Sequence, residues 1–433
     1  MKSTQNYRFF NWARNESCSP KNYFQPETEE ELIEIIRSHP QIRVTGTGHS
    51  WNKICLTDGA LLNFDNFNKV LDLEIPKLQV KVQPGIKLWQ LNEFLDKRGL
   101  ALKNLGSISD QSAAGAISTG THGTGINYQI LGSQIEEFWM IKADGEKLLI
   151  HKDQDKELFE LAMVNLGCLG IISSVTLNVV PAFNLHDVTT IRNFDEVIDN
   201  LDELVAKSDH FKLWWFPHTE NVVVYQYRRT QEAINDSRLR QWFMEELVSV
   251  NAYRLMLKIG TLNRDWRRNI NKTLVQKFIT PLNRIEKSFK VFNVPEPPLH
   301  REAEWAFDIC IAKDLLRDYK KRINASKHRI NFLQEIRFTK ADDFALSPCY
   351  KRDTIWLGAY NADNFGWEDL LADFELIAKQ YKGRPHWGKE FRSVGHDYLQ
   401  SVYPRLNEFN ELRQKLDPDK KFSNDFINKV FEN

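Results

Sequence analysis

The stretch that decides the fold runs from Gly106 to Gly125 and reads GSISDQSAAGAISTGTHGTG. Five of its twenty residues are glycines and seven carry a hydroxyl group. Small side chains leave backbone N–H groups accessible and hydroxyls add further donors, so such a surface suits a pyrophosphate. On spacing alone, an irregular loop without a ligand is the alternative interpretation.

Two shorter glycine-rich segments lie on either side of this stretch. Residues 44–50 read VTGTGHS and residues 167–172 read GCLGII. The chain has no G-x-G-x-x-G motif that opens a helix and no G-x-x-x-x-G-K-[ST] pattern of a P-loop. Nicotinamide and ATP sites of those two types are therefore disfavoured.

Helical and strand-like patterns alternate along the chain. Thr28 stands three residues before Glu31 and just ahead of an apolar helical stripe, which predicts a capping box and a helix that stops before Pro40. Further spacing predicts a helix over residues 88–99 and strands at 42–45, 78–83, 175–180, 211–216 and 222–227. The pattern predicts an α+β fold with a domain boundary near residue 182.

The composition is that of an ordinary globular protein. Hydrophobic residues make up 42% of the 433, charged residues 27% and aromatic residues 12%. Because 58 Lys and Arg balance 58 Asp and Glu, no global field collects nucleic acid, and we expect no nucleic-acid partner.

Cysteine usage and hydropathy predict the compartment. The five cysteines are scattered and never form C-x-x-C, which argues against a disulfide framework and a zinc site and predicts a reducing, cytoplasmic location without a bound metal. The opening MKSTQNYRFFNWARNESC lacks an apolar run of signal-peptide length, and nowhere do about 18 uncharged apolar residues occur together. We therefore expect neither secretion by such a peptide nor a membrane span.

One segment carries a strong local charge. Residues 250–290 contain ten Lys and Arg against Asp265 and Glu286, interleaved with apolar side chains. This pattern fits a peripheral membrane contact. A solvated helical face of a soluble domain is the alternative.

Several motifs, in order, together resemble one flavoprotein family. They are the opening Asn11-Trp12-Ala13, the G-x-G-H-S turn at 46–50, the stretch 106–125, Gly170-Ile171-Ile172, Glu335-Ile336-Arg337, and Arg384-Pro385-His386-Trp387-Gly388-Lys389. This order resembles the aldonolactone oxidase and alditol oxidase branch of the vanillyl-alcohol-oxidase-type flavoproteins. The resemblance covers most of the chain.

The resemblance implies a fold and a cofactor. It implies an α+β architecture in which a two-subdomain FAD-binding domain (1–182) is followed by an α+β substrate or cap domain (183–405), while the segment 406–433 returns to the FAD domain. Residues implied to contact FAD are Val44, Thr45, Gly46, Thr47, Gly48, His49, Ser50, Ser107, Ser112, Gly115, Thr119, Gly120, Thr121, His122 and Ile172.

His49 matches the position at which many relatives attach FAD covalently through the flavin 8α-methyl carbon. An imidazole nitrogen is a nucleophile at neutral pH, so the residue type suits this bond. Some relatives bind FAD without it, and a histidine that only makes a hydrogen bond in the turn is the alternative.

Four residues are implied to act on the substrate side of the flavin. Glu335 and Arg337 stand two apart, so in a strand they point to one face, and the resemblance places them with Ser107 and Lys389 beside the substrate. An exposed ion pair and a surface lysine are the alternatives. His386 is expected to be structural.

The resemblance also implies a reaction. It is the oxidation of a secondary hydroxyl of a sugar-derived lactone, as in D-arabinono-1,4-lactone or L-gulono-1,4-lactone oxidases, by hydride transfer to flavin N5. Gly106 leaves room beside the flavin, which favours O2 as acceptor, with H2O2 as product, over a quinone or cytochrome.

Two alternatives to a lactone oxidase stay open. The alditol oxidases carry a His and a Thr where this chain has Gly358 and Tyr360, which favours a lactone over an acyclic polyol. An alditol or other carbohydrate oxidase or dehydrogenase, and a non-catalytic flavin-binding protein, remain the other hypotheses.

Overall fold

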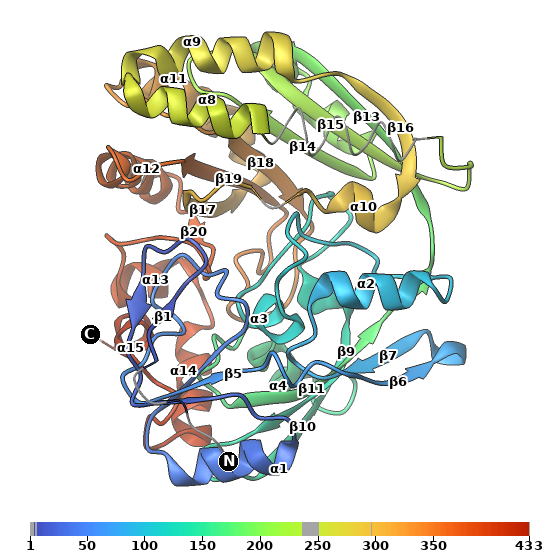
Figure 1. Ribbon diagram of the computed structural model, residues 1–433, viewed down its shortest axis with the longest axis vertical. Coiled ribbons are helices and arrows are strands. Elements are labelled where there is room, and N and C mark those ends of the chain that lie inside the picture. The colour runs from blue at the N-terminus through green and yellow to red at the C-terminus, as the bar shows by residue number, and fades with distance from the viewer. Residues whose placement is uncertain (1–3, 5–6, 236–250, 296, 433) are drawn as a thin grey trace.

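The computed structural model describes residues 4, 7–235, 251–295 and 297–432. Two halves, each built around β-sheet, lie one above the other, and the chain's first and last helices, α1 and α15, both belong to the lower half (Figure 1). Within the described ranges, no helix combines the length and the apolarity that crossing a bilayer requires.

The lower half begins with a small parallel sheet. Strands β3 (Asn22–Phe24), β5 (Ala60–Asn63) and β4 (Ile42–Thr45) lie in that order, and α1 (Glu29–Ser38) connects β3 to β4. The Thr28 hydroxyl accepts a hydrogen bond from the Glu31 backbone N–H, as the capping signal predicts. The helix buries Leu32, Ile35 and Ile36 against the sheet.

A five-stranded antiparallel sheet forms the rest of the lower half. Its order is β10 (Lys147–His151), β9 (Ile135–Ile141), β11 (Ile171–Asn178), β7 (Gln79–Val82) and β6 (Val70–Glu74). Nearby are α2 (Leu88–Asp96), α3 (Ala113–Ser118), α4 (Lys156–Ala162) and the short pair β8 (Leu100–Ala101) and β12 (Val180–Pro181). The glycine-rich stretch 106–125 contains α3 and is otherwise mostly loop.

An antiparallel sheet, eight-stranded in the described residues, forms the upper half. Its order is β16 (Leu282–Lys287), β13 (Asn184–Asn193), β15 (Asn221–Thr230), β14 (His210–Trp215), β18 (Gln334–Thr339), β19 (Thr354–Asn361), β17 (Arg301–Asp308) and β20 (Arg384–Pro385). Apolar side chains of α5 (Phe194–Asp199), α6 (Leu201–Ala206), α11 (Ala312–Ala325) and α12 (Trp367–Gln380) are buried in the same core cluster as Phe211, Leu213 and Trp215 of β14. Because side chains alternate along a strand, β14 turns Lys212 and Trp214 to the opposite face.

That opposite face is partly covered by the basic segment. Helices α8 (Asn251–Leu262) and α9 (Arg267–Thr273) lie together at the top of the molecule in Figure 1, and α10 (Ser288–Phe292) lies lower. Leu274 and Val275, just after α9, form a small core with Phe216 and Val223. The faces of α8 and α9 that lie away from this core contact solvent.

The C-terminal part of the chain packs back onto the lower half. Helices α13 (His396–Val402), α14 (Leu406–Leu416) and α15 (Asp425–Phe431) belong to it, and Phe422 joins the core of α1 and β4. The buried Arg43 guanidinium donates to the backbone carbonyls of Gly167 and Phe422, at 2.9 and 2.5 Å, and thereby ties three distant segments together. The division at 182 and 405 stays a prediction, whereas the predicted α+β class is confirmed.

Candidate active site

A cavity of about 530 Å³ brings together the predicted motifs from both halves. From the lower half, residues that line it are Val44, Thr45, Gly46, Thr47, Gly48, His49, Ser50, Ser107, Ser112, Gly115, Thr119, Thr121, His122 and Ile172. Glu335, Arg337 and Lys389 line it as well. Gly120 is the one predicted site residue that does not, because it packs against Val164 and Pro348 in a left-handed turn with φ of 73°.

The glycine-rich segments form the cavity wall by close backbone packing. A Cβ added at Gly46 would lie 2.1 Å from Ser112 Oγ and 3.1 Å from Ser112 Cβ, so any larger residue would force Ser112 to shift, and glycine lets the first turn approach the start of α3 closely. Nearby, the buried Thr121 Oγ1 has no hydrogen-bond partner among the described residues. A cavity with this hydroxyl in its wall, together with Ser107 and Thr119, fits a ligand rich in phosphate and hydroxyl groups, as FAD is.

His49 is held by the opening segment of the chain. Its Nδ1 lies 2.8 Å from the Thr47 hydroxyl, and its ring stacks on Trp12 with centroids 5.4 Å apart. The Trp12 backbone N–H donates to Gly48 O at 2.8 Å, and Asn11 Nδ2 donates to Ser50 O at the same distance. The imidazole therefore has a fixed orientation in the cavity wall.

Glu335 and Arg337 form a buried ion pair on β18. Each residue is 7% exposed, and Arg337 Nε lies 3.5 Å from Glu335 Oε2. A stronger partner, Glu304 on β17, has its Oε1 2.5 Å from Arg337 Nη2. Burial opposes the charge, but these two carboxylates outweigh it and raise the pKa of Arg337. The pair is part of the cavity wall rather than an exposed surface pair.

Lys389 is held by a carboxylate and an aromatic ring. Its Nζ lies 2.5 Å from Glu302 Oε2 and 3.8 Å from the centroid of the Trp51 ring. Although burial favours the protonated acid, Lys389 lowers the pKa of Glu302. The Trp51 backbone N–H donates to Gly388 O at 2.8 Å, so the late lysine segment lies directly on the turn that carries His49.

The sequence motifs missed Glu302 and Glu304. Both stand on β17 two residues apart, separated by the buried Ala303 and followed by the buried Trp305. Their alternation with apolar residues is a signal that could have identified them, because it places two carboxylates on one face of a strand. They supply the counter-charges for Lys389 and Arg337.

Lys212 and Trp214 were missed in the same way. Trp214 Nε1 donates to Glu335 Oε1 at 2.9 Å, and Lys212 Nζ lies 3.4 Å from the same oxygen. The Lys212 ammonium also lies 4.8 Å from the Trp214 ring and 5.0 Å from the Tyr225 ring. Burial lowers the pKa of Lys212, and Glu335 opposes this shift.

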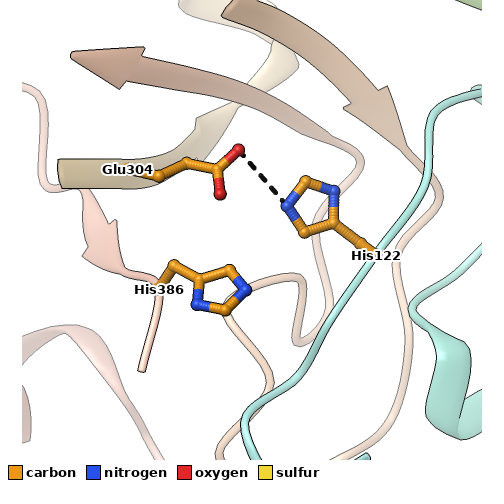
Figure 2. Close-up of side chains that lie close together, drawn as sticks. All are labelled: His122, Glu304 and His386. Carbon is orange, nitrogen blue, oxygen red and sulfur yellow. Dashed lines mark ion pairs between the residues drawn. The ribbon is translucent and has the colours of Figure 1, made fainter. Parts of the chain in front are cut away.

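Three buried groups meet beside Arg337. His122, Glu304 and His386 point toward one another from three separate segments (Figure 2), and their nearest ligand-type atoms lie within 4.8 Å of one another. His122 Nε2 lies 3.4 Å from Glu304 Oε1, and its ring stacks on Trp356 with centroids 3.6 Å apart. Two imidazoles and a carboxylate this close could hold a metal ion. The Arg337 guanidinium already neutralises Glu304, however, so a metal cation would be repelled by Arg337 at this position.

Gly358 and Tyr360 share one space on β19. A Cβ at Gly358 would lie 2.5 Å from Cε2 of the Tyr360 ring, so the ring occupies the room that a larger side chain would need. The Tyr360 hydroxyl lies 3.4 Å from Glu335 Oε2. In place of the His and Thr expected for an alditol oxidase, this chain therefore has a glycine and a tyrosine ring that fills the space beside it.

Models of two protein families match the chain. The D-arabinono-1,4-lactone oxidase family matches residues 175–430, and the FAD binding domain family matches residues 20–149.

Curated relatives match along nearly the whole chain. L-gulonolactone oxidase of Bos taurus is 35% identical over 434 residues, 98% of both chains. L-gulono-1,4-lactone dehydrogenase of Mycobacterium tuberculosis is 31% identical over 424 residues, 97% of this chain and 98% of that protein. A crystal structure of cholesterol oxidase from B. sterolicum has a TM-score of 0.86 and 15% identity, and covers 99% of this chain and 97% of that one. At that identity the likeness shows the fold alone.

Proposed function

Because the chain belongs to the D-arabinono-1,4-lactone oxidase family, we propose that it oxidises a secondary hydroxyl of a sugar-derived 1,4-lactone. Its cofactor is FAD. The observation that carries the proposal is the meeting of Glu335, Arg337 and Lys389 with the glycine-rich turns on one cavity. A protein that only stored flavin would not need three buried charged side chains at that wall.

The chain's own residues have distinct roles in this proposal. When bound, FAD supplies the acceptor for the hydride that leaves the substrate carbon. Arg337 and Lys389 are two fixed cations that stabilise negative charge developing on the substrate oxygen, and their buried counter-ions keep them in place. Glu335 orients the ligand hydroxyls from the same face, assisted by Ser107 across the cavity.

A cyclic lactone fits the charge balance of the wall better than an ionised open-chain acid does. Lys212, Arg337 and Lys389 are each already paired with a carboxylate. A ligand carboxylate would therefore bring an uncompensated buried charge, whereas a neutral lactone would not. Gly358 and the Tyr360 ring stand where the alditol oxidases have His and Thr, which supports a lactone substrate over an alditol.

The electron acceptor is a separate question, because the bovine relative is named an oxidase and the mycobacterial relative a dehydrogenase. We propose O2, reduced to H2O2, since Gly106 leaves its position in the cavity wall without a side chain. A quinone or cytochrome is the other outcome of the test. We also propose that His49 carries FAD covalently, supported by its fixed orientation in the wall.

A peripheral membrane contact through the basic segment is a further part of the proposal. Residue 250 lies outside the described residues, but from Asn251 onward Leu255, Leu262 and Trp266 are 58, 81 and 50% exposed. The exposed cations in the described part of this segment are Arg254, Lys258, Arg264, Arg268, Lys272, Lys277 and Lys290. Exposed apolar side chains among cations are typical of a surface that lies on anionic lipid.

The membrane proposal is tested by sedimentation with vesicles. The holoprotein should sediment with phosphatidylserine-containing vesicles and not with pure phosphatidylcholine, and Lys258→Glu with Arg264→Glu should abolish it. Equal sedimentation of this double variant would contradict the proposal. The segment would then be an ordinary solvated face, and the cytoplasmic location that we propose from the scattered cysteines would hold without membrane contact.

The test of the catalytic proposal is anaerobic bleaching. The yellow holoprotein is mixed without oxygen with L-gulono-1,4-lactone, D-arabinono-1,4-lactone, the corresponding aldonates and a set of alditols. Bleaching by a lactone, and recovery of colour with H2O2 formation when air is admitted, is the expected result. Bleaching by alditols alone would favour an alditol oxidase, and no bleaching at all a non-catalytic flavin protein.

A further inference from the structure

A row of side chains crosses the upper wall of the cavity from strand to strand. Its members pair directly across neighbouring strands, and each of them lines the cavity. In order they are Arg337 on β18, Lys212 on β14, Tyr225 on β15, Thr189 on β13 and Leu282 on β16. We call this row the ladder.

The ladder is longer than the ligand of the proposed function. Neighbouring strands lie about 4.8 Å apart, so the four steps from Arg337 to Leu282 span about 19 Å. A lactone ring held by Arg337 and Lys389, with its short exocyclic chain, covers only about two of these steps. None of the residues implied to contact FAD belongs to this sheet. The end of the ladder near Leu282 is therefore left for another part of the substrate.

A second row, two residues further along the same strands, adds polar groups to that end. Tyr227 pairs with Asp187, Asp187 pairs with Arg284, and all three line the cavity. Asp187 is 2% exposed and accepts hydrogen bonds from the Thr189 hydroxyl at 3.0 Å and from Arg284 Nε at 3.1 Å. Because Arg284 compensates the charge of this carboxylate, the end of the ladder suits a neutral ligand.

Tyr225 and Tyr227 present their hydroxyls to the same space. Within the described residues, neither hydroxyl has a hydrogen-bond partner, and both oxygens keep some accessible surface, although Tyr227 as a whole is only 4% exposed. Burial, followed by the nearby Asp187, raises the pKa of both phenols, so the hydroxyls stay protonated and can donate. The Tyr225 ring also packs edge-to-face on Trp214, with centroids 4.8 Å apart, and both rings are partly exposed.

These groups together are suited to a sugar ring. Partly exposed aromatic rings pack against its C–H face, while a few fixed polar groups pair with its hydroxyls. A sugar hydroxyl both donates and accepts, so it can satisfy a tyrosine hydroxyl. A purely apolar ligand would leave the hydroxyls of Tyr225 and Tyr227 buried without partners, and an anion would bring an uncompensated charge.

We propose that the end of the ladder near Leu282 binds a second, neutral sugar unit, joined to the primary hydroxyl outside the lactone ring. This rests on the proposed function and narrows its substrate class to a glycosylated 1,4-lactone. The lactone lies at Arg337 and Lys389, and the glycosyl group lies against Tyr225 and Tyr227.

The test compares L-gulono-1,4-lactone with its 6-O-β-D-glucopyranosyl derivative. The holoprotein is first reduced with dithionite in the absence of oxygen, so that it cannot accept a hydride, and binding is measured by isothermal titration calorimetry. We expect the glucosyl lactone to bind at least about tenfold more tightly than the plain lactone. D-arabinono-1,4-lactone and its 5-O-β-D-glucopyranosyl derivative are compared in the same way.

Substitutions on the ladder should remove this preference selectively. Tyr225→Phe with Tyr227→Phe deletes both hydroxyls and keeps both rings. In this double variant the two lactones should bind within about threefold of each other, while the plain lactone binds as it does to the wild type. Leu282→Trp, at a partly exposed position on an edge strand of the described sheet, places a ring across the end of the ladder and should have the same effect.

Tyr253→Phe is the matched control. This residue of α8 lines the same cavity, but it stands outside the ladder and its hydroxyl oxygen is buried. The substitution deletes one tyrosine hydroxyl, as each change in the double variant does, and should leave the preference for the glucosyl lactone unchanged.

The contrary outcomes are distinct. Equal binding of plain and glucosyl lactone to the reduced wild type would overturn the inference, and bleaching of the oxidised protein by the plain lactone would still support the proposed function. A full preference kept in both the double variant and Leu282→Trp would also overturn it, as would a loss in Tyr253→Phe as large as in the double variant. If no lactone bleaches the oxidised protein, the proposed function fails on that result, while the calorimetric comparison still decides whether the ladder binds a sugar.

Discussion

Lys389 and Glu302 form a buried ion pair, Nζ to Oε2 2.5 Å, which joins the segment after β20 to strand β17 of the upper sheet. Replacing Lys389 by Met keeps the length of the side chain but removes the ammonium and leaves the carboxylate unpaired. We expect anaerobic flavin reduction by the lactone to slow by about 10² to 10³-fold, because a fixed cation beside developing negative charge is lost. Near-normal reduction in stopped-flow measurements would remove this role. Lys207→Met, at an exposed helical pair, is the control.

Arg337 contacts two buried carboxylates, Glu304 and Glu335. In Arg337→Ala both remain buried without this partner, so we expect the free energy of unfolding to fall by about 3–5 kcal/mol. Urea denaturation of the holoprotein measures it. Arg392→Ala, whose side chain is half exposed, should cost less than about 1 kcal/mol. Equal losses of unfolding free energy in the two variants would contradict the conclusion that Arg337 stabilises a buried ion-pair network.

The proposed bond between His49 and FAD has a simple readout. After denaturation in detergent, the wild-type polypeptide should keep its flavin fluorescence on a gel. His49→Ala should bind FAD in the native state and release all of it on denaturation. Finding all wild-type flavin in the supernatant of the denatured protein would show that no such bond forms.

Gly106 tests the choice of electron acceptor. A Cβ there would lie 3.2 Å from Thr121 Cγ2 and 3.3 Å from His122 O. These contacts are tight enough to reduce the free space beside Gly106 but do not amount to a severe clash. In Gly106→Ala we expect reoxidation by O2, followed as H2O2 formation, to slow more than anaerobic reduction by the lactone. A Cβ at Gly395 meets nothing within 4 Å, so Gly395→Ala is the control. Equal slowing of both half-reactions in G106A would argue against an oxygen path at this position.

Asp342, in the loop between β18 and β19, couples stability to pH. Burial raises the pKa of this carboxyl to about 7. Since its pKa is higher in the folded than in the unfolded chain, its contribution is fully present at low pH and is lost as pH rises from about 4 to about 7. Asp342→Asn mimics the protonated acid, so it should match the wild type at pH 4 and exceed it at pH 8 by on the order of a few kcal/mol.

Chemical denaturation of both proteins at the two pH values measures this difference. The same difference at pH 4 and pH 8 would contradict a raised pKa for Asp342. The Ser347 hydroxyl, 2.5 Å from Asp342 Oδ2, can donate to the ionised carboxylate and accept from the protonated acid or the Asn amide, so the substitution keeps that contact.

Much of the fold could be predicted from the sequence, because its signals are local. The Thr28 cap, the stop before Pro40, the alternation over 42–45 and the β-branched and aromatic run over 222–227 depend on neighbouring residues, and the structure has these elements within a few positions. The predicted α+β class, the family and FAD are confirmed by the comparisons. The roles of individual site residues stay predictions.

The partners of the predicted site residues could not be derived from the sequence. Arg337 belongs to the motif Glu335-Ile336-Arg337, but its strongest partner, Glu304, stands 33 positions earlier in the chain. The two residues meet because β17 and β18 both pair with β19. Lys389 likewise finds Glu302 only through the path of the chain after β20. Spacing within one strand places two side chains on a face, but it does not say which strands lie beside it.

By itself the sequence therefore determined the kinds of element and the glycine turns, since these follow from backbone freedom and side-chain type over a few residues, whereas the ligand was implied by the resemblance of its motifs to a flavoprotein family. Only the tertiary structure decided that a cation, a carboxylate and an imidazole from three distant segments share one buried space. The physical reason is that strand order and register depend on how the whole core packs, and a charge can be buried only where that packing brings its counter-charge to it.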